Sequence, residues 1–165
     1  VAKPIIIYCR TKKQYLKYAN QNTAGTTWIT NSKTYLVLWK GGLTLDVIAH
    51  ELCNAELTAR VGFMTRMFMV PACFDEGLAM QLDNRSSFTW QTDTATYYDY
   101  LKPLRGYKSF GEGGFKKVHL NYCFARIEVA NWLGTGKEET LQDLLKGLSQ
   151  GKDFHQCYRS VDGRN

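Results

Sequence analysis

The stretch TLDVIAHELCNAELTARVG, residues 44–62, contains the clearest helix in the sequence. Thr44 is a typical N-cap residue, and Gly62 suits the position just beyond the last turn. Apolar residues recur at helical spacing and predict a buried stripe that faces a core: Leu45, Ile48, Leu52, Ala55 and Ala59. On the opposite side of the helix, His50 and Asn54 lie about 40° apart at 3.6 residues per turn.

The elements around this helix predict an α+β fold in a single domain spanning residues 1–165. Short apolar or β-rich runs before the helix predict strands, with one short helix among them, over residues 4–9, 11–20 (the helix), 26–30 and 34–39. Helical spacing returns downstream, over residues 75–82, 115–133, 138–148 and 154–159. The segment 84–114, rich in Ser, Thr, Tyr and Gly, reads as an irregular loop over a site.

Composition is that of a globular protein large enough to bury a core without help from metals or disulfides. Hydrophobic residues make up 44% of the chain and charged residues 22%. No run of eighteen apolar residues occurs, so we expect no membrane span. The net charge is +6, but the cations look scattered along the chain, which favours a solvated surface and no specific nucleic-acid site. An acidic partner, such as nucleic acid or an anionic envelope, is the alternative.

The cysteines bear on the compartment in which the protein works. None of the five has CxxC spacing, which argues against a zinc ribbon or a thioredoxin-like motif: Cys9, Cys53, Cys73, Cys123 and Cys157. Two disulfides with one free thiol would suit an exported protein, and five buried thiols would suit a cytosolic one. Because five is high for a cytosolic chain of this size, a secreted or periplasmic location is slightly favoured.

The segment HELCN, residues 50–54, differs by one residue from the zinc-binding pattern H-E-x-x-H. That pattern works because positions i and i+4 share a helix face, where two imidazoles can bind one Zn²⁺. The glutamate between them points beside the metal and can accept a proton from a water molecule. Here His50 and Glu51 take the first two roles, and Asn54 stands at the position of the second histidine.

The pair H-E alone is weak evidence for a zinc site, because it is commonly a surface or structural pair. A second segment strengthens that interpretation. The stretch VPACFDEGLA, residues 70–79, resembles the glutamate helix of gluzincin zinc metallopeptidases. The stretch HELCNAEL, residues 50–57, is similar to the H-E-L-x-H-x-x-L of the same family. The resemblance is specific over residues 45–80 and loose elsewhere. It implies a zincin-like fold, with a small N-terminal sheet, an active-site helix, a glutamate helix and a helical C-terminal half.

The resemblance also implies roles for particular residues. His50 and Glu76 would bind Zn²⁺ together with position 54, and Glu51 would be the general base and then the proton donor. A Tyr or His of the C-terminal half commonly steadies the oxyanion in this family; Tyr122 is the candidate and His119 the alternative. Three loop tyrosines stay open for that role: Tyr97, Tyr98 and Tyr100. The strand predicted over 34–39 would pair with the main chain of an extended peptide or protein substrate.

Asn54 is the departure from the family pattern. A neutral amide oxygen is a poor zinc ligand beside imidazole or thiolate. Three explanations stay open: an engineered change, a natural loss that leaves a pseudopeptidase, or a rewired site in which the Cys53 thiolate is a ligand. We therefore expect a zinc-dependent endopeptidase scaffold that is impaired in this chain. The alternatives are a non-catalytic module that binds a peptide or protein, or a secreted effector or toxin with an inhibitor or immunity protein as partner.

Overall fold

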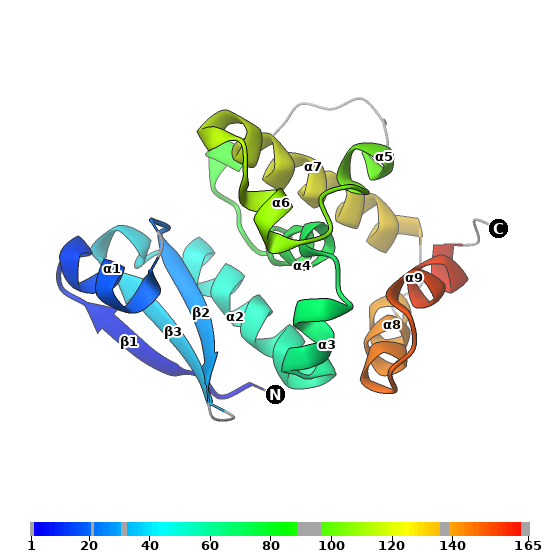
Figure 1. Cartoon of the computed structure of the whole chain (residues 1–165), viewed down its shortest axis with the longest axis horizontal. Coiled ribbons are helices and arrows are strands. Elements are labelled where there is room, and N and C mark those ends of the chain that lie inside the picture. Colours follow the sequence, from blue (N-terminus) through cyan, green and yellow to red (C-terminus); the bar gives the residue numbers. More distant parts are fainter. Residues whose placement is uncertain (1, 21, 31–32, 89–96, 136–138, 163–165) are drawn as a thin grey trace.

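A computed structural model of the chain describes residues 2–20, 22–30, 33–88, 97–135 and 139–162. Within these residues it contains one three-stranded sheet and nine α-helices, which confirms the α+β class. The sheet and one helix form one end of the molecule, and the other helices form the rest (Figure 1). No helix in the described part is long and apolar enough to cross a bilayer.

The sheet is built from β1 (Ile5–Cys9), β2 (Gly25–Thr30) and β3 (Lys33–Trp39), in the order β1-β3-β2. β3 therefore lies in the middle, parallel to β1 and antiparallel to β2. The helix α1 (Lys12–Ala19) joins β1 to β2. Thr11 caps its first turn in a capping box with Gln14, as the predicted helix over 11–20 requires.

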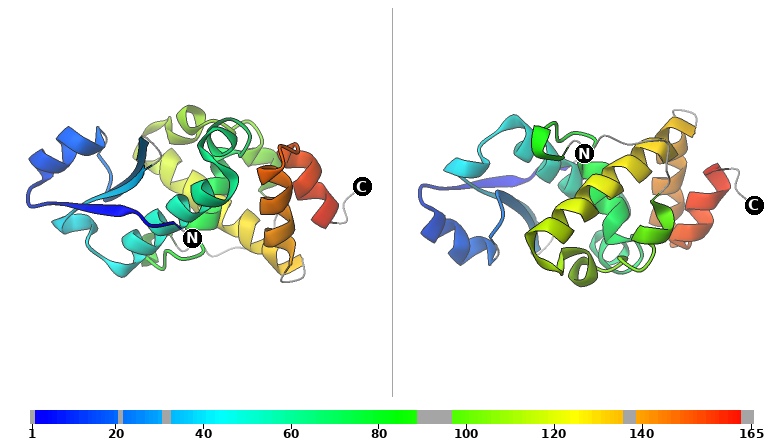
Figure 2. Two further views of the ribbon diagram at one scale, coloured as in Figure 1. Left: turned by 90° about the horizontal axis from the view of Figure 1, so that it is seen from below. Right: turned by 90° about the horizontal axis from the view of Figure 1, so that it is seen from above.

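Helices cover the sheet on both sides (Figure 2). On one face, Tyr15 and Ala19 of α1 are buried against Cys9 and Val37 of the strands. On the other face lies α2 (Leu45–Val61), the predicted active-site helix. A Cβ atom at Gly25 would lie 2.9 Å from Val47 of α2, so glycine lets the helix approach β2 closely.

The ends of α2 confirm the prediction, but its buried face does not. Thr44 accepts a hydrogen bond from the Val47 amide, and Gly62 follows the last turn with a φ of +88°. The predicted apolar stripe, however, is largely on the outside: Leu45 is 86% exposed and Leu52 is 39% exposed. α2 instead buries the side that carries His50, because β2, α4 and α8 all pack around that side.

The remaining elements follow in order along the chain. After the short 3-10 helix η1 (Lys40–Gly42) and α2 come α3 (Phe63–Phe68) and α4 (Ala72–Ala79), the predicted glutamate helix, which begins earlier than expected. The region predicted to be irregular contains η2 (Ser86–Phe88), α5 (Tyr98–Leu101) and α6 (Tyr107–Gly111), and its residues 89–96 lie outside the described part. The C-terminal helices are α7 (Gly114–Thr135), α8 (Thr140–Ser149) and α9 (Phe154–Asp162), close to the predicted ranges.

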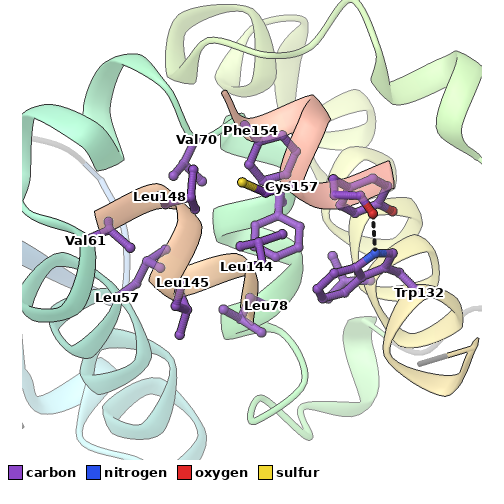
Figure 3. Close-up of a cluster of buried hydrophobic side chains, with 13 residues drawn as sticks. Leu57, Val61, Val70, Leu78, Trp132, Leu144, Leu145, Leu148, Phe154 and Cys157 are labelled. Atoms are coloured by element: carbon purple, nitrogen blue, oxygen red, sulfur yellow. Dashed lines mark hydrogen bonds between the residues drawn. The ribbon is translucent and has the colours of Figure 1, made fainter. Parts of the chain in front are cut away.

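The main core lies where α2, α4, α7, α8 and α9 meet (Figure 3). Trp132 of α7 is fully buried, and its indole Nε1 donates a hydrogen bond to the Tyr158 carbonyl at 3.3 Å. The ring of Phe74 in α4 packs edge-on against Trp132, with 5.4 Å between the centroids. Because Phe74 lies on the helix that carries Glu76, this core fixes the position of α4.

Gly77 is a test of how closely α4 and α7 approach. A Cβ atom there would lie 2.5 Å from the Ala125 carbonyl oxygen, whereas one at Gly134 would meet nothing within 4 Å. We expect Gly77→Ala to lower the free energy of unfolding by about 1–3 kcal/mol through overpacking. Gly134→Ala, the control, should raise it by about 0.5–1 kcal/mol, since alanine favours the helix. Urea unfolding measures both, and a neutral Gly77→Ala would contradict the close contact.

Candidate active site

His50 of α2 lies between two carboxylates. Its Nε2 atom is 3.2 Å from Oε2 of Glu76 in α4, within hydrogen-bond distance. Its Nδ1 atom is 3.6 Å from Oδ2 of Asp83, an ion-pair distance too long for a hydrogen bond. His50 is 7% exposed and Asp83 is fully buried, so these charges interact in a poorly solvated site.

The two carboxylates keep His50 protonated in this arrangement. Burial alone would lower the pKa of His50, but Asp83 and Glu76 outweigh it and raise the pKa to about 10. Burial would likewise raise the pKa of Glu76, but the hydrogen bond and charge of His50 outweigh it and lower that pKa. Zn²⁺ binds neutral imidazole, so a metal ion at Nε2 would have to displace this proton. A carboxylate on the Nδ1 side is how metal-bound histidines are commonly oriented.

Glu51 is the next residue of α2 and is buried toward the sheet. It is 8% exposed, and the Thr27 hydroxyl of β2 donates a hydrogen bond to its Oε2 atom at 2.7 Å. Burial is the largest influence on Glu51 and raises its pKa, so its carboxyl group holds a proton more readily than a solvated glutamate. A carboxyl group whose pKa is moved toward neutrality is suited to accept and return a proton.

Asn54 lies one turn beyond His50 on the buried side of α2. It is 6% exposed, and its Oδ1 atom is buried without a hydrogen-bond partner in the described part of the chain. An unpaired buried acceptor costs about 1–3 kcal/mol. The oxygen is thus left for a contact that the described residues do not supply, although an amide is a weak donor to zinc.

Within the described ranges, no three His, Cys, Asp or Glu side chains are arranged to hold a metal ion. His50 and Glu76 are two side chains of these types in contact, and the third position in the H-E-x-x-H pattern is Asn54. A histidine at 54 would supply the missing imidazole from the same helix face.

Tyr122 of α7 is the oxyanion candidate that the fold brings to this pair. Its ring centroid is 6.4 Å from that of His50, and the nearby charge of Glu76 acts on its hydroxyl. Burial raises its pKa well above the usual value, so it stays a proton donor at neutral pH. The alternative, His119, instead stacks on Phe88, with 5.0 Å between the centroids.

The tyrosines near α5 have other contacts. Tyr97 stacks on Phe124 with 4.1 Å between the centroids, and the Tyr100 hydroxyl donates to Asn121 at 2.8 Å. Tyr98 packs against the main core. These contacts hold α5 on α7 and away from the His50–Glu76 pair.

Two other expectations change with the structure. The strand predicted to pair with a peptide, β3, is the middle strand, so both of its edges are already used. The outer strand beside the site is β2, which carries Thr27. Cys53 packs against the main core, and burial raises the pKa of its thiol to about 12, so it is a poor thiolate ligand at neutral pH.

Neither of the two cysteine states left open by the sequence is matched in full. Cys9, Cys53, Cys73 and Cys123 form no disulfide in the described part of the chain, which leaves too few cysteines for two bridges, and Cys53 and Cys73 are only partly buried.

A buried ion pair that the sequence did not predict helps to hold α4 in place. Arg66 of α3 donates from Nε to Oδ2 of Asp75 at 2.6 Å and from Nη1 to the Thr58 hydroxyl at 3.0 Å. The Tyr107 hydroxyl of α6 also donates to Asp75. Asp75 precedes Glu76 directly, so this network joins α2, α3 and α6 at the residue beside the candidate ligand.

Removing Arg66 tests this support. Arg66→Ala leaves Asp75, 1% exposed, without its cation, and should cost about 3–5 kcal/mol of unfolding free energy. Arg60 forms a similar pair with Glu56, but their side chains are 41% and 30% exposed. Arg60→Ala should therefore cost less than about 1 kcal/mol. Chemical denaturation measures both, and equal effects would show that the Arg66 pair is not structural.

Comparison with known proteins adds no family to this picture: no family model, no curated protein and no solved structure matches the chain. The functional case accordingly rests on the residues of the site. Those are His50 between two carboxylates, a buried Glu51 with a raised pKa, and an unpaired Asn54 oxygen on the same helix.

Proposed function

We propose that this chain is a zinc metallopeptidase domain of the gluzincin kind, with a zincin-like fold, whose metal site is weakened by Asn54. The observation that carries the proposal is the position of His50, with Nε2 on Glu76 and Nδ1 toward Asp83. A histidine exposed on a helix surface would not need the carboxylates of Glu76 and Asp83 beside its two ring nitrogens. Asp83 on the Nδ1 side would orient the ring as in metal-bound histidines, and Zn²⁺ would take the place of the proton between Nε2 and Glu76.

The ligands of Zn²⁺ would be His50, Glu76 and, weakly, Asn54. Zinc held there would polarise a peptide carbonyl as a Lewis acid and make water a stronger nucleophile. Asp83 would orient the His50 ring, as carboxylates commonly do for metal-bound histidines. Because its third ligand is a neutral amide, we expect the chain to bind zinc poorly and to be impaired as a peptidase.

The residues of the chain would handle the protons. Glu51, hydrogen-bonded to Thr27 and with a raised pKa, would take a proton from the attacking water and pass it to the leaving amine. Tyr122, a half-buried proton donor near Glu76, would donate a hydrogen bond to the developing oxyanion. β2 is one of the two outer strands of the described sheet and the one that contacts Glu51, so an extended peptide would pair along its edge.

The amount of zinc bound by the parent chain and by Asn54→His tests whether Asn54 weakens a zinc site or the chain only resembles a zinc peptidase in sequence. We expect Asn54→His to carry about one zinc per chain and the parent chain much less, since zinc sites favour three strong protein ligands. Elemental mass spectrometry after equal dialysis measures both. Lys13→His, which adds an imidazole on the exposed side of α1, is the control for adventitious binding. An Asn54→His protein that takes up no more zinc than this control would refute the metal site.

The role of Glu51 can be tested in the zinc-binding background. In the Asn54→His protein, a further Glu51→Gln should keep the zinc but lower peptide cleavage about 10²–10⁴-fold, because the amide cannot accept the proton. Cleavage of an unstructured protein substrate, followed by mass spectrometry, provides the rate. Unchanged cleavage by the double variant would remove Glu51 from the chemistry.

A non-catalytic peptide-binding module is the second candidate function. The observation that favours it is the weak ligand at position 54 beside an outer strand, β2, that needs no metal to pair with a peptide. This function predicts a partner whose affinity for the parent chain is unchanged by a chelator. Loss of partner binding in the presence of a chelator would instead favour the metal site.

A further inference from the structure

The net positive charge of the chain belongs to one end of the molecule. Residues 46–165 contain fourteen Lys or Arg residues and fifteen Asp or Glu residues, whereas residues 1–45 contain no Asp or Glu. The cations of residues 1–45 are seven: Lys3, Arg10, Lys12, Lys13, Lys17, Lys33 and Lys40. The cations that look scattered in the sequence are thus gathered on the sheet lobe, formed by β1, α1, β2 and β3 (Figure 1). All seven are exposed, and none forms an ion pair with a described residue.

One face of this lobe is only half covered. α1 packs over the part of the sheet that holds Cys9 and Val37. Farther from α1 on the same face, the strand register places Ile5, Tyr35 and Trp28 side by side, one from each strand. Ile5 is 46% exposed, Trp28 is 44% exposed and Tyr35 is half-buried. We call these three residues the cross-strand row.

Cations flank the cross-strand row. Lys33 is two residues before Tyr35 in β3, so its side chain leaves the same face of the sheet. Lys3 is two residues before Ile5, at the same end of the sheet. Because α2 lies on the opposite face, the row is separated by the thickness of the sheet from His50 and Glu76 (Figure 2).

We propose that this face of the sheet lobe binds single-stranded nucleic acid. Trp28 and Tyr35 offer flat rings on which bases stack, and Lys3 and Lys33, on a lobe whose own residues include no Asp or Glu, attract the phosphates. The charge is complementary to a polyanion over the whole lobe, whereas the cores of protein interfaces are depleted of lysine. Exposed strand aromatics framed by lysines suit unpaired bases better than a duplex, whose bases are already stacked.

Oligonucleotide binding by the whole chain tests the charge. Fluorescence anisotropy with a labelled, mixed-sequence single strand of about 12 nucleotides gives the dissociation constant. Lys3→Glu combined with Lys33→Glu should weaken binding about ten-fold, because two phosphate contacts are lost and two repulsive charges gained. The control is Lys116→Glu with Lys117→Glu, two exposed lysines of α7, which changes the net charge equally and should cost less than about two-fold.

Trp28 tests the stacking. Trp28→Ala should weaken oligonucleotide binding about ten-fold, whereas Trp28→Phe should restore most of it, since each stacked base contributes strongly in such sites. Binding of heparin, a polyanion without bases, should be the same for Trp28→Ala and the parent chain. Thermal unfolding followed by circular dichroism confirms that the variants compared are folded.

Three outcomes would overturn the proposal. Absence of oligonucleotide binding at low salt would do so directly. Equal losses for the two lysine pairs would show an unspecific charge effect, and an unchanged affinity of Trp28→Ala would remove the stacking face. Binding to vesicles rich in phosphatidylserine, with none to the oligonucleotide, would assign the lobe to a membrane surface instead.

Discussion

The burial of the polar side of α2 is the constraint on which the rest of the structure depends. A helix that turns His50, Glu51 and Asn54 inward must supply a partner for each, because unpaired polar groups are costly away from water. α4 supplies Glu76, the segment after α4 supplies Asp83, and β2 supplies Thr27. Among the described residues the Asn54 oxygen has no hydrogen-bond partner, and His50 Nδ1 has only the ion-pair contact with Asp83 at 3.6 Å. The arrangement of these elements around α2 is therefore the arrangement that satisfies its charges.

This constraint also explains why α2 exposes leucines. Its helical spacing gives two candidate inner faces, one apolar and one polar, and hydrophobicity alone selects the apolar one. In the folded chain Leu45 and Leu52 face outward. The buried side combines the polar residues with apolar Val47, Leu57 and Val61, so ion pairing and core packing act on the same face. A residue pattern read along one helix cannot include carboxylates that arrive from a different helix. For the same reason Asp83 was missed, although it follows the glutamate helix by only a few residues.

Local signals predicted the parts of the fold that depend on local physics. The caps Thr11, Thr44 and Gly62 mark helix ends correctly, since a capping residue acts within a single turn. The strands were predicted but their order was not, because pairing across the sheet is a long-range choice. The place of β3 in the centre moved the expected peptide edge to β2. Of the site, the sequence indicated His50, Glu51, Glu76 and Tyr122, and the structure adds Thr27 and Asp83 around them.

The hydroxyl of Thr27 joins the sheet lobe to the site on α2 through one short bond to Glu51. A side chain in such a position makes the proton affinity of the carboxylate sensitive to small displacements of the strand. Coupling of this kind is reciprocal: an occupant that shifts β2 alters the readiness of Glu51 to take a proton, and the charge state of Glu51 alters how tightly that occupant is held. The strand proposed to hold a peptide is therefore also the strand whose hydroxyl contacts the proposed general base.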